Sequence, residues 1–110
     1  IPTEQLQQSV RRASIVARDN SNRVILRTAG DKLTVTAESS SVGSAYEEVD
    51  IVREGEDVEI GFSAKYLLDF LAVVETEAIE MLLTGNLNPA LLRPQDDMSY
   101  TYVLMPMQIR

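Results

Sequence analysis

The stretch VEIGFSAKYLLDFLAVV, residues 58–74, changes its hydrophobic period halfway along. Its first residues alternate apolar and polar side chains, as a half-buried β-strand does. Later apolar residues recur at helical spacing, and Ser63 stands where a helix N-cap is expected. The apolar positions of this predicted helix are Leu67, Phe70, Leu71 and Val74. A strand that runs directly into an amphipathic helix predicts a fold that mixes α and β structure.

The residues before this stretch predict one helix and three strands. Thr3 is a candidate cap for a helix that runs to about Arg18, and one face of that helix is apolar. The apolar face consists of Leu6, Val10, Ala13 and Ala17. Alternation predicts strands around residues 23–27, 33–37 and 45–53, with a turn at residues 29–31 and a serine-rich loop at residues 39–44.

The residues after this stretch predict strands at 79–83, 90–92 and 99–107, with turns at 85–86 and 96–97. The order is therefore α-β-β-β followed by β-α-β-β-β, as if one βαβββ unit were used twice. The first unit lacks its leading strand, because only Ile1 and Pro2 precede its helix. We expect an α+β domain with two helices packed on one side of an antiparallel sheet, one edge of which the missing strand leaves unpaired.

Length and composition exclude several classes of protein. The 110 residues are enough for one domain with a hydrophobic core. The absence of cysteine and histidine excludes disulfide scaffolds, thiolate or imidazole metal sites and Ser-His-Asp catalysis. No stretch approaches the roughly 18 apolar residues of a membrane span, and no signal peptide is recognisable. We expect a soluble, intracellular protein whose single domain covers residues 1–110.

Charge is distributed unevenly along the chain. Residues 1–30 carry five arginines and two acids, whereas residues 31–62 carry nine acids and two bases, within a net charge of −7. On the first predicted helix, Arg11 and Arg18 share a polar stripe that contains no acid. This stripe suits contact with a phosphate backbone without sequence reading. The plainer interpretation is that both arginines are simply solvated.

Two further features indicate contact with another protein. Ile15 lies nearly opposite the apolar face of the first helix, beside Arg12 and near Val16. The acidic stretch from Glu47 to Asp50 offers a pole of opposite charge. The helix end and this strand therefore suit two parts of one complementary interface.

The C-terminal stretch YVLMPMQIR, residues 102–110, places Pro106 between two methionines. Proline removes a backbone donor from a strand, and methionine is an adaptable side chain found on surfaces that bind varied apolar ligands. The residues alone leave two interpretations open, a binding surface or a last core strand with a loose tail.

Signals for catalysis are poor. The chain contains no dinucleotide-binding, P-loop, zinc-protease or nucleophile-elbow motif. Its adjacent acids, at residues 47–48, 56–57 and 96–97, fall in a strand or in turns, where we expect them to be solvated. Two other functions remain open besides a specific binding module. One is a small acidic metal-dependent hydrolase, which requires acids to converge on one pocket. The other is a generic α+β adapter domain.

Three segments together resemble a known family: GFSAKYLLD at residues 61–69, NPALLRP at 88–94 and YVLMPM at 102–107. They are similar to the third, C-terminal domain of the bacterial DNA polymerase III β subunit, the β sliding clamp, and the likeness spans nearly the whole chain. The resemblance implies a DNA-clamp fold of two βαβββ units, with residues 1–2 as the end of an interdomain linker. Relatives carry a strand between the Ile-Pro-Thr region and the first helix, whereas here that helix follows at once.

The resemblance also implies a function. Two three-domain protomers of this family close into a ring around duplex DNA, with helices lining the channel. We therefore expect a processivity factor, not an enzyme and without a cofactor, in the cytoplasm at the nucleoid. Its expected partners are encircled double-stranded DNA, a second protomer, and the polymerase III α subunit, clamp loader and repair proteins, which bind through short hydrophobic motifs. No membrane partner is expected.

The family further implies roles for particular residues, and none of these roles is catalytic or metal-binding. Arg11 and Arg18 match positions that face the DNA channel. The matches to the protomer contact are Arg12, Ile15, Val16, Glu47 and Glu48. The matches to the peptide-binding pocket, which lies between the second and third domains, are Pro2, Pro89, Val103, Met105, Pro106 and Met107.

Overall fold

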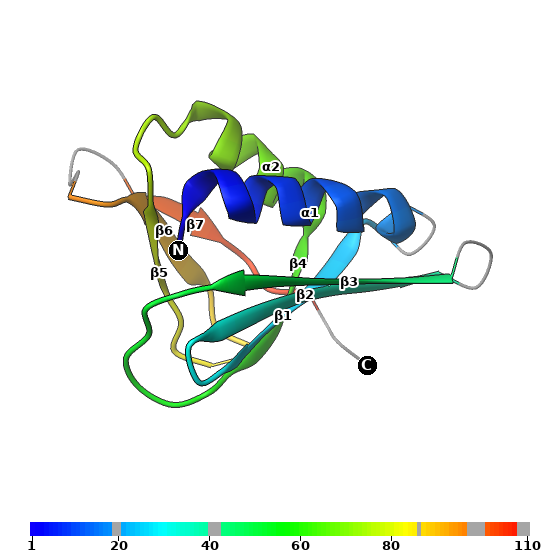
Figure 1. Cartoon of the computed structure of the whole chain (residues 1–110), viewed down its shortest axis with the longest axis horizontal. Coiled ribbons are helices and arrows are strands. Elements are labelled where there is room, and N and C mark those ends of the chain that lie inside the picture. Colours follow the sequence, from blue (N-terminus) through cyan, green and yellow to red (C-terminus); the bar gives the residue numbers. More distant parts are fainter. Residues whose placement is uncertain (19–20, 40–42, 86, 97–100, 108–110) are drawn as a thin grey trace.

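The computed structural model of the chain describes residues 1–18, 21–39, 43–85, 87–96 and 101–107. These residues form two helices and seven strands (Figure 1). In chain order the elements are α1 (Thr3–Ala17), β1 (Arg23–Ala29), β2 (Lys32–Ser39), β3 (Gly43–Asp50), β4 (Glu59–Ser63), α2 (Ala64–Val73), β5 (Ile79–Leu82), β6 (Ala90–Pro94) and β7 (Tyr102–Leu104). The order of helices and strands predicted from hydrophobic periodicity is confirmed.

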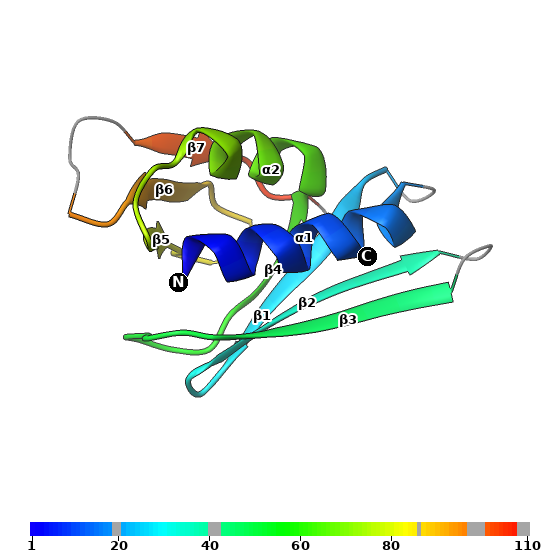
Figure 2. The ribbon, with the colours of Figure 1, turned by 45° about the horizontal axis from the view of Figure 1, so that its top comes forward.

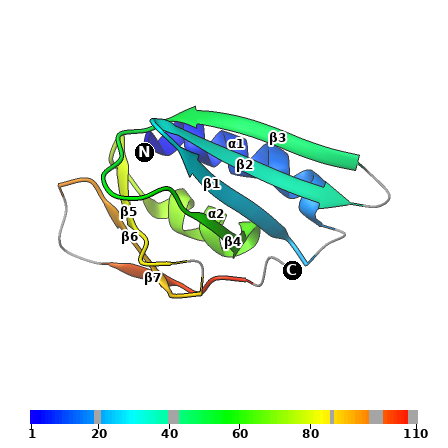
Figure 3. The same cartoon turned by 90° about the horizontal axis from the view of Figure 1, so that it is seen from below.

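The strands form two antiparallel sheets, and the prediction of a single sheet is wrong. One sheet has the order β3-β2-β1-β4, and the other has the order β5-β6-β7. β4 pairs with β1, where Gly61 lies opposite Ile25. The chain then leaves this sheet through α2 and begins the second sheet at β5 (Figure 3). The prediction failed because alternation identifies strands but does not identify the strands with which they pair.

The first two residues lie at the edge of β5, where a leading strand is expected. Pro2 forms an isolated antiparallel bridge with Ala78. The Ile79 N–H donates a hydrogen bond of 2.9 Å to the Ile1 carbonyl. The start of the first unit therefore joins the sheet of the second unit, just as β4 joins the sheet of the first. At the position of the strand that the sequence predicts to be missing, the described residues form only this single bridge.

Both helices lie on one side of the sheets and pack against each other (Figure 2). The four apolar residues predicted for the buried face of α1 are all fully buried. One hydrophobic core joins both helices to both sheets. Its largest fully buried side chains include Phe62, Phe70, Leu6, Leu26, Leu33 and Ile60. A single core of this kind holds the two sheets in one domain.

The two predicted helix caps have different outcomes. Ser63 caps α2 as predicted, because its Oγ accepts a hydrogen bond of 3.5 Å from the Tyr66 N–H. Thr3 does not cap α1, since it is already the first helical residue and Pro2 takes the N-cap position. Its N–H donates to the Glu77 carbonyl at 2.9 Å, while its buried Oγ1 has no partner among the described residues.

Some strand ends differ from the prediction. β3 ends at Asp50, after which Arg53 donates through Nε to the Gly30 carbonyl at 2.7 Å and holds the following loop against the β1–β2 turn. Among the described residues, β7 covers Tyr102–Leu104 of the predicted strand 99–107 and ends before Pro106, which has no N–H for a ladder. The predicted loop and turns fall partly outside the described residues, at 40–42, 86 and 97–100.

Candidate functional site

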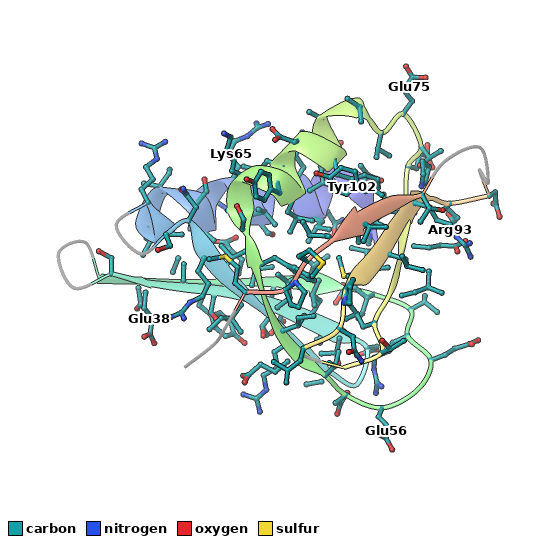
Figure 4. All side chains as sticks on the ribbon, turned by 180° about the vertical axis from the view of Figure 1, so that it is seen from behind. Glu38, Glu56, Lys65, Glu75, Arg93 and Tyr102 are labelled. Atoms are coloured by element: carbon teal, nitrogen blue, oxygen red, sulfur yellow. The ribbon has the colours of Figure 1, made fainter. Side chains whose placement is uncertain are left out.

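A groove of about 560 Å³ opens beside β7 and the start of α2. One wall is formed by residues 102–107, which comprise β7 and the segment that follows it. The opposite wall is formed by Ser63, Lys65 and Tyr66 at the start of α2, together with the turn residues Ser21 and Asn22. We call this site the tail groove; its walls can be followed from Lys65 and Tyr102 in Figure 4.

The apolar wall of the tail groove is anchored at both ends. The Tyr102 ring packs on the buried ring of Phe70, with centroids 5.5 Å apart, which ties β7 to α2. At the other end, the Met107 N–H donates to the Gly61 carbonyl at 2.7 Å and so ties the tail to β4. Between these anchors, Leu104 is buried in the core, whereas Met105 is 64% exposed. The alternation of a strand therefore presents Met105 to the solvent while Leu104 holds the backbone down.

The polar wall is fixed by the turn before β1. Ser21 and Asn22 both have positive φ, at 59° and 58°, which turns the chain tightly between α1 and β1. The Asn22 carbonyl accepts a hydrogen bond of 2.7 Å from the Ala64 N–H, the first helical residue of α2. The turn between α1 and β1 and the start of α2 are therefore held together at the groove.

The structure brings together four of the six residues predicted for a peptide pocket. Val103, Met105, Pro106 and Met107 all line the tail groove. Among the residues that the structure describes, Pro2 and Pro89 do not line it. Pro2 lies at the edge of β5, and Pro89 is exposed immediately before β6.

Sequence reasoning missed the polar wall of the groove. Tyr66 is 54% exposed and lines the groove beside Lys65, although both residues belong to the quoted segment at 61–69. The sequence signal that could have identified this wall was Tyr66, an aromatic residue outside the apolar positions of the predicted helix and close to its cap Ser63. Asn22 carried no comparable signal, because it reaches the groove only through the contact between the α1–β1 turn and the start of α2.

The residues predicted for a protomer contact lie on α1 and on β3, an outer strand of the four-stranded sheet. Ile15 is 55% exposed and Val16 is half-buried. Arg12 donates through Nε to Glu47 Oε1 at 2.9 Å, and its NH2 nitrogen lies 2.8 Å from the same oxygen. This hydrogen bond and the attraction to Glu47 raise the pKa of Arg12 above its ordinary value.

Glu47 and Glu48 lie on opposite faces of β3, as the alternation of a strand requires. Glu47 faces α1 through its pair with Arg12, whereas Glu48 accepts a hydrogen bond of 3.4 Å from the Tyr46 hydroxyl. Of the five predicted contact residues, the structure brings Arg12 and Glu47 together, whereas Glu48 lies on the other face of β3.

The two arginines predicted to approach DNA lie on the exposed surface of α1. Arg11 and Arg18 are both exposed, and neither forms an ion pair with another described residue. Arg12, between them, is instead paired with Glu47. The guanidinium groups of Arg11 and Arg18 are therefore available for contact with solvent or a ligand.

Two observations bear on the other classes considered. Among the described residues, no three acidic side chains gather as ligands for a metal ion. Within the same part of the chain, no helix is long and apolar enough to cross a membrane.

An α+β domain of two helices and two antiparallel sheets, with a groove that has one apolar wall, has the features of a binding module. Residues 1–108 match the family model described as DNA polymerase III beta subunit, C-terminal domain, and the chain belongs to this family. The family resemblance inferred from the three quoted segments is thereby confirmed.

Individual relatives agree with this assignment. The chain is 34% identical to the beta sliding clamp of Haemophilus influenzae over 106 residues, which are 96% of this chain and 29% of that protein. It is 33% identical to the beta sliding clamp of Staphylococcus aureus over 102 residues, covering 91% of this chain and 27% of the relative. The chain thus spans less than a third of the length of these relatives.

Solved structures show the same architecture. The DNA polymerase III beta subunit of Thermotoga maritima superposes with a TM-score of 0.96 at 29% identity, covering all of this chain and 30% of that one. The sliding clamp of Pseudomonas aeruginosa bound to griselimycin superposes with a TM-score of 0.94 at 30% identity, covering 99% of this chain and 30% of that one.

Proposed function

We propose that the chain is the part of a processivity clamp that holds partner proteins, and that the tail groove is its docking site. The observation that carries this proposal is the exposed, adaptable methionine of a tail anchored at both of its ends. An apolar wall on a fixed backbone suits short hydrophobic motifs, because it offers contact area without the entropic cost of ordering the site. The structure of the Pseudomonas aeruginosa clamp with griselimycin supports ligand binding by a protein of this fold.

The rest of the proposal concerns the whole clamp. We infer a DNA-clamp fold of two βαβββ units that exchange their leading strands, as the Pro2–Ala78 bridge and the β1–β4 pairing indicate. Arg11 and Arg18 face encircled double-stranded DNA without reading its sequence. Arg12, Ile15, Val16 and Glu47, with Glu48 on the far face of β3, supply one half of a contact between protomers. The role is to tether enzymes, without nucleotide chemistry of its own.

The proposed partners follow from the same role. The groove takes short hydrophobic motifs of the polymerase III α subunit, the clamp loader and repair proteins, in the cytoplasm at the nucleoid. Shallow apolar peptide sites commonly bind with dissociation constants near 1 µM, about −8 kcal/mol. Pro2 and Pro89 lie away from the described groove, and a second domain is expected to complete it. We therefore expect weaker binding by this chain alone.

Methionine methyl NMR tests the groove directly. Griselimycin is titrated into the 110-residue chain with labelled methionine methyl groups, and shifts are expected at Met105 and Met107. Met81 lies in β5 outside the groove lining and serves as the internal control. The proposal is supported if the two tail methionines shift while Met81 does not. Unchanged tail methionines at saturating griselimycin would remove the groove as a binding site.

A further inference from the structure

Methionine is the only sulfur-containing residue type in this chain. The sequence has four methionines and no cysteine, so no thiolate competes with the thioethers for a peroxide. Oxidation of a methionine to its sulfoxide turns a flexible apolar side chain into a polar one. The effect of such an oxidation on the domain therefore depends on where each methionine lies.

The three methionines that the structure describes differ in their exposure. Met105 is 64% exposed, Met107 is half-buried, and Met81 in β5 is packed against the hydrophobic core. Met98 falls outside the described residues. Because the susceptibility of a side chain to oxidation follows its exposure, we expect Met105 to react before Met81 and Met107.

The fold holds Met105 in the solvent without any local opening. Leu104, before it, is buried in the core, and Met107, after it, donates its N–H to the Gly61 carbonyl at 2.7 Å. The backbone on both sides of Met105 is therefore fixed while its side chain points outward. A peroxide reaches this sulfur in the native state, whereas a half-buried thioether becomes accessible through fluctuations of the fold.

The chemical step is a transfer of one oxygen atom. The sulfur of Met105 attacks one oxygen of hydrogen peroxide, so that an S–O bond forms and the O–O bond breaks. The sulfur loses two electrons, the peroxide is reduced, and the departing hydroxide takes up the proton left on the transferred oxygen and becomes water. A dithiol reverses the step through methionine sulfoxide reductases, yielding the thioether, a disulfide and water.

A sulfoxide at this position affects a ligand more than it affects the fold. Met105 forms part of the apolar wall of the tail groove together with Val103, Pro106 and Met107. An apolar ligand seated on this wall covers the sulfoxide oxygen and deprives it of water, which is unfavourable without a new hydrogen bond. In the free domain the same oxygen stays in the solvent and does not enter the core.

We propose that Met105 is a reversible oxidation site, at which a hydroperoxide releases the ligands of the tail groove. The oxidation site is inferred from the fixed exposure of Met105, and its effect on ligands rests on the proposed function of the groove. The device requires no other reactive side chain of this domain.

Controlled oxidation of the 110-residue chain tests the proposal. Met98 is replaced by leucine in every sample, and each sulfoxide is followed by methionine methyl NMR and peptide mass mapping during treatment with hydrogen peroxide. Met105 is expected to be oxidised at least about threefold faster than Met81. Oxidation of Met105 is expected to raise the dissociation constant of griselimycin about tenfold without changing the midpoint of urea unfolding. Reduction by methionine sulfoxide reductases with a dithiol is expected to restore the original affinity.

Two variants identify the residue responsible, each compared with itself before and after peroxide. Met105→Leu is expected to show the same griselimycin affinity in both states, whereas Met81→Leu is expected to show the tenfold loss. Equal oxidation rates of Met105 and Met81 overturn the oxidation site. An unchanged affinity after oxidation of Met105, a loss that persists in Met105→Leu, or a loss accompanied by a lower urea midpoint overturns its effect on ligands.

The reduced chain separates this inference from the proposed function. If it binds griselimycin and the outcomes above fail, the groove stands and the role of Met105 is overturned. If the reduced chain does not bind griselimycin, the proposed function of the groove fails and the effect of oxidation on ligands fails with it, while the oxidation rates still decide the site.

Discussion

Met107 and Gly61 form an antiparallel bridge, in which the Met107 nitrogen lies 2.7 Å from the Gly61 carbonyl oxygen. Met107 follows β7 in the chain, and Gly61 is the middle residue of β4. The bridge joins the end of one sheet to the edge of the other. Because the backbone is held at Met107 and again at Leu104, the intervening Met105 and Pro106 cannot collapse onto the core. The apolar wall of the tail groove is therefore a consequence of how the two sheets are linked.

Met105 and Leu104 are expected to separate binding from stability. Met105→Ala removes a side chain that is 64% exposed, so the free energy of unfolding is expected to change by less than about 0.5 kcal/mol. Griselimycin affinity is expected to fall about fivefold, from the loss of roughly 1 kcal/mol of apolar contact. Leu104→Ala deletes a buried side chain and is expected to cost about 2–5 kcal/mol of stability. Urea unfolding measures the stability of the two variants, and NMR titration measures their affinity for griselimycin. A strongly destabilised Met105→Ala would contradict the exposed position of Met105.

Ile15→Asp is expected to leave the domain folded and to disrupt association of a full-length clamp that carries this domain. Ile15 is 55% exposed, so its replacement is expected to change the free energy of unfolding by less than about 1 kcal/mol. A carboxylate in an apolar protomer contact lacks a partner and opposes association. Val73→Asp, on the exposed surface of α2, is the control and is expected to retain dimers in analytical sedimentation. Dimers unchanged in Ile15→Asp would exclude Ile15 from the contact.

Thr3→Val is expected to stabilise the domain. The Thr3 Oγ1 is buried and has no hydrogen-bond partner among the described residues, so valine of similar shape removes a desolvated polar atom. We expect a gain of about 1 kcal/mol in the free energy of unfolding, measured in urea. Thr3→Ser keeps the hydroxyl but deletes the methyl group, and is expected to lower stability instead. A loss of stability in Thr3→Val would show that the hydroxyl has a partner in solution.

The Lys32–Asp50 pair makes a prediction about pH. The hydrogen bond that Lys32 donates to Asp50, and then the charge of Asp50, raise the pKa of Lys32 above its ordinary value of 10.5. The folded state therefore holds this proton more tightly than the unfolded chain. The contribution to stability is complete below 10.5 and is lost as the pH rises through the folded-state pKa.

Carbon-13 NMR of the Lys32 Cε resonance tests the assignment. In Asp50→Asn the pKa of Lys32 is expected to move down toward 10.5, because its main partner is gone. Asp31→Asn removes the weakest of the attracting charges and is expected to produce a smaller decrease. Equal decreases in the two variants would contradict the assignment of Asp50 as the partner.

The sequence by itself determined the local elements of this protein. The apolar face of α1, the β1–β2 hairpin and the Ser63 cap all follow from side-chain spacing within one element, which is set by the geometry of the helix and the strand. The apolar half of the tail groove was also predictable, from the Met-Pro-Met segment and the family that it resembles.

Only the tertiary structure decided how these elements combine. The division into two sheets, the Pro2–Ala78 bridge and the Met107–Gly61 bridge depend on backbone hydrogen bonds, which nearly every residue type can form, so no local pattern identifies the partner. The same holds for Thr3, which is the first helical residue and not the N-cap, and whose N–H donates to the Glu77 carbonyl. Lys65 is a related case. It lines the groove because of where α2 lies relative to β7, which begins 37 residues after Lys65 in the chain.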